Sequence, residues 1–167
     1  GLGYVKTTMT GANLNTFTVN KTAPGTSWGS VYAQFTQRTT DITDASMGLS
    51  VKRELIYDGE LKVGSKVKVR ITITADRDYD FVQVVDKRAA CMEPIDQISG
   101  YMRGYYYSPR DNATYYYTDM MRKGTHVIEA TYYIDRPGTF TTGTCTVQCA
   151  YSPAYMARTK SQTLMIK

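Results

Sequence analysis

The three cysteines, Cys91, Cys145 and Cys149, are the residues best suited to redox or metal chemistry. No two of them have C-x-x-C spacing and the chain holds one histidine, so a metal site would lack ligands, and we expect none. Cys145 and Cys149 fall on one predicted strand, where their spacing covers ~13 Å. A disulfide needs Cα atoms within ~7 Å. Any bridge must therefore use Cys91, and we predict Cys91–Cys149 with Cys145 as a free buried thiol. Three reduced, buried thiols are the alternative.

His126 is the only candidate for a general base of the histidine type. It falls at the start of a predicted strand, in the phase that faces inward. A catalytic dyad would need a Ser or Cys beside it and a carboxylate to orient it, and no G-x-S-x-G elbow occurs. We interpret His126 as structural and predict no catalytic residue, so the chain is not expected to be an enzyme.

Asp76, Asp78 and Asp80 form a D-x-D-x-D pattern between two predicted strands. Alternate carboxylates can converge on a calcium ion, but the glycine and distal glutamate of an EF-hand loop are absent and Arg77 intervenes. The pattern therefore favours a solvated loop.

Two tyrosine clusters, residues 105–107 and 115–117, flank a turn-forming segment at 108–112. The pattern predicts a β-hairpin. Neighbouring residues of a strand point to opposite faces, so we expect half of the tyrosines in the core and half in solvent. The exposed half could serve as an aromatic platform for a sugar or a protein partner.

The chain has a net charge of +5, with acidic and basic residues interleaved. A net charge of this size usually serves only to keep a protein soluble. The sequence contains no motif of a known nucleic-acid-binding domain, so we expect no nucleic-acid partner. A glycine-rich phosphate cradle is also missing, and we predict no cofactor. No apolar stretch approaches the ~20 residues that cross a bilayer. Any membrane attachment would come from an anchor outside this chain.

Strict alternation dominates the second half of the chain. Val67, Val69, Ile71 and Ile73 share one phase, with polar residues between them. This pattern, repeated between closely spaced turns and supported by the 15 tyrosines, predicts an all-β, immunoglobulin-like antiparallel β-sandwich. The only helical turn we expect is near residues 153–158. The basic row at 66, 68 and 70 is interpreted as protection of an edge strand.

Residues 1–45 show a different residue pattern from the rest of the chain. Strands are predicted at residues 16–20 and 28–35, and the polar segment 36–47 reads as a linker. Two strands cannot form a stable unit. We therefore place a domain boundary near residue 46, with extra N-terminal strands in 1–45 and the sandwich in 46–167.

Several short strings, in this order and spacing, resemble the C-terminal region of bacterial alpha-2-macroglobulin-like proteins. They are residues 27–33 (SWGSVYA), 49–55 (LSVKREL), 61–67 (LKVGSKV), 75–82 (ADRDYDFV), 122–126 (RKGTH), 136–140 (RPGTF) and 150–153 (AYSP). The resemblance extends over nearly the whole chain.

The resemblance implies that residues 46–167 form the terminal macroglobulin-type domain. Residues 1–45 would be strands returning from a preceding CUB-type domain, plus a linker. Proteins of this family trap proteases in the bacterial periplasm or cell envelope. The expected partners are the other domains of the same parent chain, and target proteases through that parent.

The reactive Cys-x-Glu-Gln motif of the family is absent; residues 91–94 read CMEP. The implied role of this chain is therefore structural and non-catalytic, through docking on neighbouring domains. The alternative is a cell-surface binding module, an adhesin or carbohydrate-binding sandwich, that uses the tyrosine-rich hairpin.

Overall fold

The structure is a computed structural model that describes residues 3–11 and 16–167. It divides into two units, Gly1–Phe35 and Thr36–Lys167. The second unit holds a short 3-10 helix, Thr39–Asp41, and the strands β1 Ala45–Met47, β2 Leu49–Ile56, β3 Lys66–Ala75, β4 Tyr79–Lys87, β5 Met92–Pro94, β6 Gly100–Met102, β7 Tyr105–Pro109, β8 Ala113–Met121, β9 Gly124–Ile134, β10 Gly138–Thr141, β11 Cys145–Cys149, β12 Met156–Arg158 and β13 Thr163–Ile166. Within the described part of the chain, no helix has the length and apolarity to cross a bilayer.

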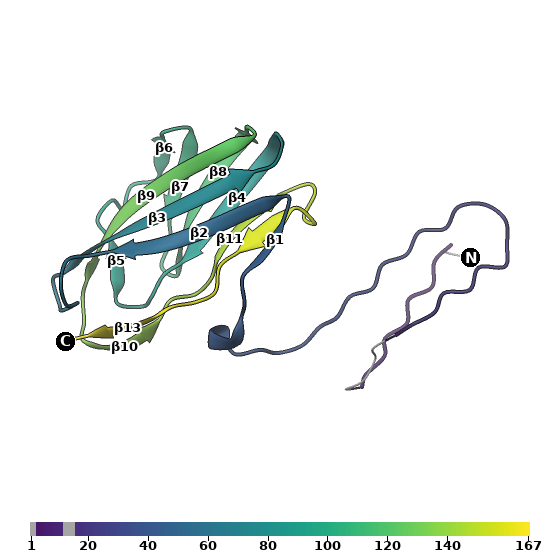
Figure 1. Cartoon of the computed structure of the whole chain (residues 1–167), viewed down its shortest axis with the longest axis horizontal. Helices are drawn as coiled ribbons and strands as arrows, with labels where there is room; N and C mark the ends of the chain where they lie inside the picture. The colour runs from purple at the N-terminus through teal and green to yellow at the C-terminus, as the bar shows by residue number, and fades with distance from the viewer. Residues whose placement is uncertain (1–2, 12–15) are drawn as a thin grey trace. The chain divides into compact units, whose positions relative to one another are not determined.

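The strands form a sandwich of two antiparallel layers. Hydrogen-bonded neighbours run in the order β5-β9-β3-β2-β1-β12-β11-β4-β8-β7-β6, and β10 pairs separately with β13. In Figure 1, β9, β3 and β2 lie in front of β8, β4 and β7. The short strands β1 and β12 connect the layers. The predicted all-β sandwich is confirmed.

Alternating side chains explain why the layers pack. In β3 the residues at 67, 69, 71, 73 and 75 are buried, and those between them are exposed or half-buried. The buried set meets Tyr132 and Ile134 of β9, and Val82 and Val84 of β4, in one apolar core. Burial of this apolar area is the main force that holds the two layers together.

A charged pair lies within this core. Arg53 of β2 donates from Nη1 to Asp86 of β4 at 2.9 Å, and both side chains are 2% exposed. Its Nη2 donates to the Thr142 hydroxyl at 2.7 Å and to the Gly143 carbonyl at 2.8 Å. Burial raises the pKa of Asp86, while Arg53 opposes that rise. Arg53 thus joins both layers to the loop after β10.

The strands predicted at 16–20 and 28–35 are absent from the structure, which places no strand among the described residues before Ala45. A strand needs a hydrogen-bonded neighbour, and these segments have none. Their large apolar side chains are exposed, among them Val5, Phe17, Val19, Trp28, Val31 and Phe35.

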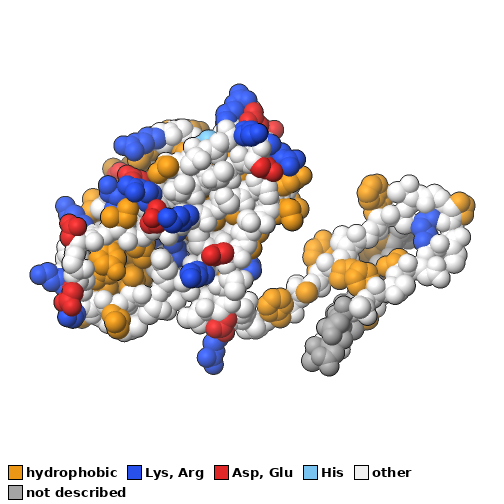
Figure 2. Space-filling model, in the orientation of Figure 1, with side chains coloured by type: hydrophobic (Ala, Val, Ile, Leu, Met, Phe, Trp, Pro, Cys, Tyr) orange, Lys and Arg blue, Asp and Glu red, His pale blue; other side chains and the backbone are white. Residues whose placement is uncertain are grey.

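Two further predictions were wrong. The segment near 153–158 contains no helix; Met156–Arg158 is β12, which pairs with both β1 and β11. The row Lys66, Lys68 and Arg70 does not protect an edge, because β3 lies between β2 and β9. Lys68 and Arg70 instead meet Glu129 of β9 at 3.8 and 2.7 Å. Figure 2 shows basic and acidic side chains interspersed on this strand unit.

Candidate interaction surface

Phe81 of β4 has an unusual backbone. Its φ is +52°, in the left-handed region that an aromatic residue rarely occupies. The pairing of β4 with β8 is interrupted at Phe81, while its carbonyl accepts a 2.8 Å hydrogen bond from the Ala150 amide. Strain of this kind costs on the order of 1–3 kcal/mol and is concentrated at functional positions.

The strained backbone presents an aromatic pair to solvent. The Phe81 ring meets Tyr151 edge-to-face, with centroids 5.2 Å apart. Phe81 is 49% exposed and Tyr151 80%. Folding gains little from rings held this far in water, so the pair is better explained by a surface that another element covers.

A second aromatic pair supports this end of the sandwich. Tyr79 and Tyr155 lie 5.4 Å apart, and the Arg77 guanidinium lies over the Tyr155 ring at 5.5 Å. Gly48, at φ +71°, packs directly beneath them. A Cβ there would clash with the Tyr79 hydroxyl and lie 2.9 Å from Tyr155 Cδ1. We call Phe81, Tyr151, Tyr79 and Tyr155 the aromatic end.

The D-x-D-x-D loop borders the aromatic end, and two of its carboxylates, Asp76 and Asp78, form ion pairs with arginines. Arg77 and the Tyr79 hydroxyl hydrogen-bond Asp76 and lower its pKa. The Lys123 amide and Arg122 do the same for Asp78. No group of potential metal ligands occurs in the described residues. Asp76 and Asp78 are therefore held by salt bridges at the edge of the aromatic end.

All three cysteines are buried free thiols. Cys149 pairs in register with Val82 near the start of β4, whereas Cys91 lies in the turn beyond the end of β4. The predicted Cys91–Cys149 bridge is not formed in this structure and stays a prediction. Burial raises the pKa of each thiol, most of all that of Cys145, which makes thiolate chemistry unfavourable.

His126 is half-buried on β9, opposite Ile73, and its Nε2 lies 2.7 Å from the Arg122 carbonyl. This contact ties β9 to the turn before it. The structural role of His126 stays a prediction.

The tyrosine clusters occupy β7 and β8, as predicted. Tyr107 and Tyr116 are buried and pack 5.5 Å apart, while Tyr106 and Tyr117 are exposed and paired across the strands. Half of the hairpin thus belongs to the core.

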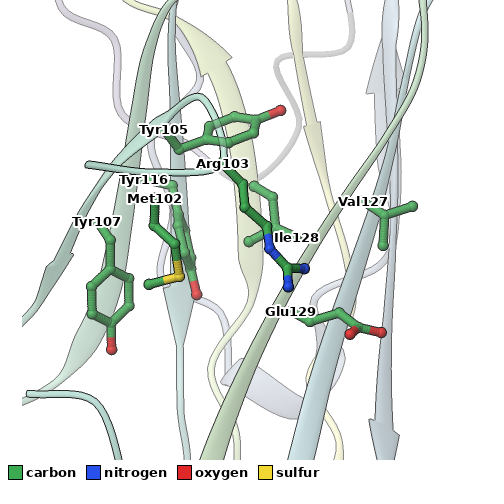
Figure 3. A pocket seen from close by; sticks show the side chains of 8 residues that line it. All are labelled: Met102, Arg103, Tyr105, Tyr107, Tyr116, Val127, Ile128 and Glu129. Carbon is green, nitrogen blue, oxygen red and sulfur yellow. The ribbon is translucent and has the colours of Figure 1, made fainter. Parts of the chain in front are cut away.

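A small cavity opens beside this hairpin. Figure 3 shows the Arg103 guanidinium directed toward Glu129 at its mouth, with Tyr107 and Tyr116 on one wall. Its volume is about 20 Å³, enough for a single water. A larger polar hollow of about 330 Å³ lies beside Arg88, Arg110, Glu93 and Asp111, whose charges balance. Neither resembles a catalytic site.

The sequence model of the bacterial alpha-2-macroglobulin MG10 domain matches residues 31–154, most of the chain. The chain belongs to this family. The resemblance inferred from the short strings is thereby confirmed, and the sandwich is an MG10 domain. Among curated proteins, no match to this sequence was found.

Solved structures share the fold. Salmonella alpha-2-macroglobulin reacted with methylamine is 22% identical, with a TM-score of 0.67, covering 75% of this chain and 10% of that one. Trypsin-activated alpha-2-macroglobulin from Escherichia coli is 17% identical, with a TM-score of 0.67, covering 75% and 11%. The native E. coli protein from MG7 to its C-terminus is 16% identical, with a TM-score of 0.67, covering 77% and 25%. The MG10 chain thus spans about a tenth of the longer macroglobulins it matches.

Sequence reasoning missed the aromatic end. Phe81 and Tyr151 were not singled out by the residue pattern, yet both are exposed. The left-handed backbone at Phe81 rotates its side chain out of the alternation, and no sequence signal marks such a residue.

Proposed function

We propose that this MG10 domain is a non-catalytic docking part of a protease-trapping alpha-2-macroglobulin-like protein of the bacterial periplasm or cell envelope. Two matched proteins are described as activated by proteases, trypsin in one and elastase in the other. The matched structures contain domains of this fold within much longer chains, which supports partners in the same parent.

The observation that carries the docking role is the Phe81–Tyr151 pair. It combines backbone strain with exposed aromatic area at one end of a rigid sandwich. Aromatic side chains are enriched at the centres of interfaces, where they bury much area for little lost side-chain freedom. We infer that a neighbouring domain of the parent covers this end.

The test adds the domain in trans to a parent protein that lacks it, and measures affinity by calorimetry. The wild-type domain should bind, and Tyr151→Ser and Phe81→Ser should each weaken binding at least tenfold. Ile98→Ser removes an equally exposed apolar side chain elsewhere, 82% exposed, and should bind like the wild type. Equal affinities for all four proteins would refute docking through the aromatic end.

We also propose that residues 1–45 comprise strands returning from a preceding CUB-type β domain, plus the linker into the sandwich, although the match to the MG10 model already begins at residue 31. The exposed apolar side chains of Phe17 and Val19 alternate with polar ones at 16, 18 and 20, which suits the uncovered face of a strand whose neighbours lie elsewhere. Fusing the chain to the preceding segment of its parent should bring Trp28 out of water, with a blue shift of its fluorescence. An unchanged spectrum would contradict this assignment.

A further inference from the structure

The polar hollow of about 330 Å³ is lined by two backbone segments that are both held in place. One is β5, whose residues Glu93 and Pro94 pair with β9. The other is the turn between β7 and β8, which the Arg110 amide closes through a 2.8 Å hydrogen bond to the Ala113 carbonyl. The lining side chains therefore project from fixed backbone, which is usual for sites that bind small molecules.

Arg88 connects the two walls of the hollow. Its Nε donates to the Met92 carbonyl at 2.9 Å, and its Nη2 donates to the carbonyls of Arg110 and of Asp111, the latter at 3.0 Å. These main-chain carbonyls fix the plane of the guanidinium, but they carry no net charge that could balance its positive charge.

The remaining nitrogen of Arg88, Nη1, is buried and has no hydrogen-bond partner within the described part of the chain. A buried donor without a partner is unfavourable, and a charged donor binds most strongly to an anionic acceptor. Arg88 is thus held rigidly beside the hollow with the capacity to bind one further acceptor.

The charged side chains that line the hollow do not pair with one another. They comprise two cations and two anions, namely Arg88, Arg110, Glu93 and Asp111. Among the residues that the structure describes, none of these four takes part in an ion pair, whereas the neighbouring Arg136 and Asp135 do pair, at 2.6 Å. A ligand with both signs of charge can therefore meet each of the four without breaking an existing ion pair.

We propose that this hollow is a binding site for a small zwitterion, a free amino acid or a dipeptide with both ends unblocked. The two arginines receive the carboxylate, and Glu93 and Asp111 receive the ammonium group. A purely anionic ligand is rejected by the two carboxylates, and a purely cationic one by the two arginines. The volume lies near the lower end of the range for small-molecule sites, about 300–1,000 Å³. The hollow shares no residue with the aromatic end, so binding here does not depend on docking there.

Titration of the full chain with alanylalanine, followed by heteronuclear NMR, tests the proposal. The dipeptide should cause saturable shifts of amides within residues 93–97 and 110–113. N-acetylated alanylalanine and the C-terminal amide each lose one charged end, and each should bind about tenfold more weakly, because a hydrogen bond between charged groups is lost. Inorganic phosphate, an anion without an ammonium group, should also bind about tenfold more weakly.

Two variants separate the two ends of the ligand. Arg110→Gln should lose the preference for a free carboxylate over the amide and keep the preference for a free amine. Glu93→Gln should show the reverse. The matched control is Arg38→Gln, which removes another exposed arginine without an ion pair in the described residues, outside the hollow, and should bind like the wild type. Circular dichroism of each variant should match that of the wild type, since neither the Arg110 nor the Glu93 side chain holds other described residues through a hydrogen bond.

Several results would overturn the proposal. One is the absence of saturable shifts at the hollow, which is expected if a side chain of a neighbouring domain is the natural occupant. Phosphate binding as tight as that of the dipeptide would show a site for anions only. Equal affinity of the free and blocked dipeptides, or an Arg110→Gln variant with unchanged preferences, would show that the four charges do not recognise the ends of a ligand.

Discussion

Removing one partner of the buried Arg53–Asp86 pair should destabilise the domain severely. Asp86→Ala leaves a guanidinium that is 2% exposed without its carboxylate. A buried charge stripped of its partner costs about 3–5 kcal/mol, because desolvation is no longer offset by attraction. We expect the free energy of unfolding, measured by urea denaturation with circular dichroism, to fall by about that amount.

The matched control is a pair of equal length at the surface. Lys52 and Glu54 are also 2.9 Å apart, but their side chains are 71% and 38% exposed. Lys52→Ala should cost about 1 kcal/mol or less, since solvent screens such pairs. An Asp86→Ala variant within about 1 kcal/mol of the wild type would refute the assignment of Arg53 as the charge that ties the layers together.

Three other predictions follow from single sites. Gly48→Ala should lower stability by about 1–3 kcal/mol in the same urea assay, because a Cβ meets both a positive φ and the Tyr79 ring; an unchanged midpoint would show that this end is loosely packed. Burial raises the pKa of Tyr116 and Tyr132 in the folded domain, so the stability that these two residues contribute should be fully present below about pH 10 and be lost above it, because unfolding lets them ionise. Absorbance at the tyrosinate band should therefore rise in two phases, the second coinciding with loss of circular dichroism; a single phase would contradict the burial. Denatured chains should titrate three thiols if the cysteines are free as in the structure, and one if Cys91 bridges Cys149.

Local alternation explains most of what the sequence could predict. Residues 66–75 have a clean period of two, and the structure places β3 there with the expected face buried. The tyrosine clusters and the turn between them similarly predicted the β7–β8 hairpin. In both cases the information lies within a few neighbouring residues.

Features that depend on distant residues could not be predicted. Arginine and aspartate usually lie at protein surfaces, so the sequence does not mark Arg53 and Asp86 as buried. Only the packing of β2 near β4 makes them a buried pair. Strands of three residues, such as β6 and β12, are too short to show a period. The left-handed φ of Phe81 departs from the extended backbone of a strand. The alternation of side chains along the sequence therefore does not predict that Phe81 is exposed.

Docking through the aromatic end is the central claim, and hydrogen exchange tests it most directly. Amide exchange should be measured by mass spectrometry in the isolated domain and in the intact macroglobulin that contains it. The account predicts added protection at residues 79–82 and 149–152 in the intact protein, with little change at the turn 110–113. Equal exchange at the aromatic end in both proteins would contradict it.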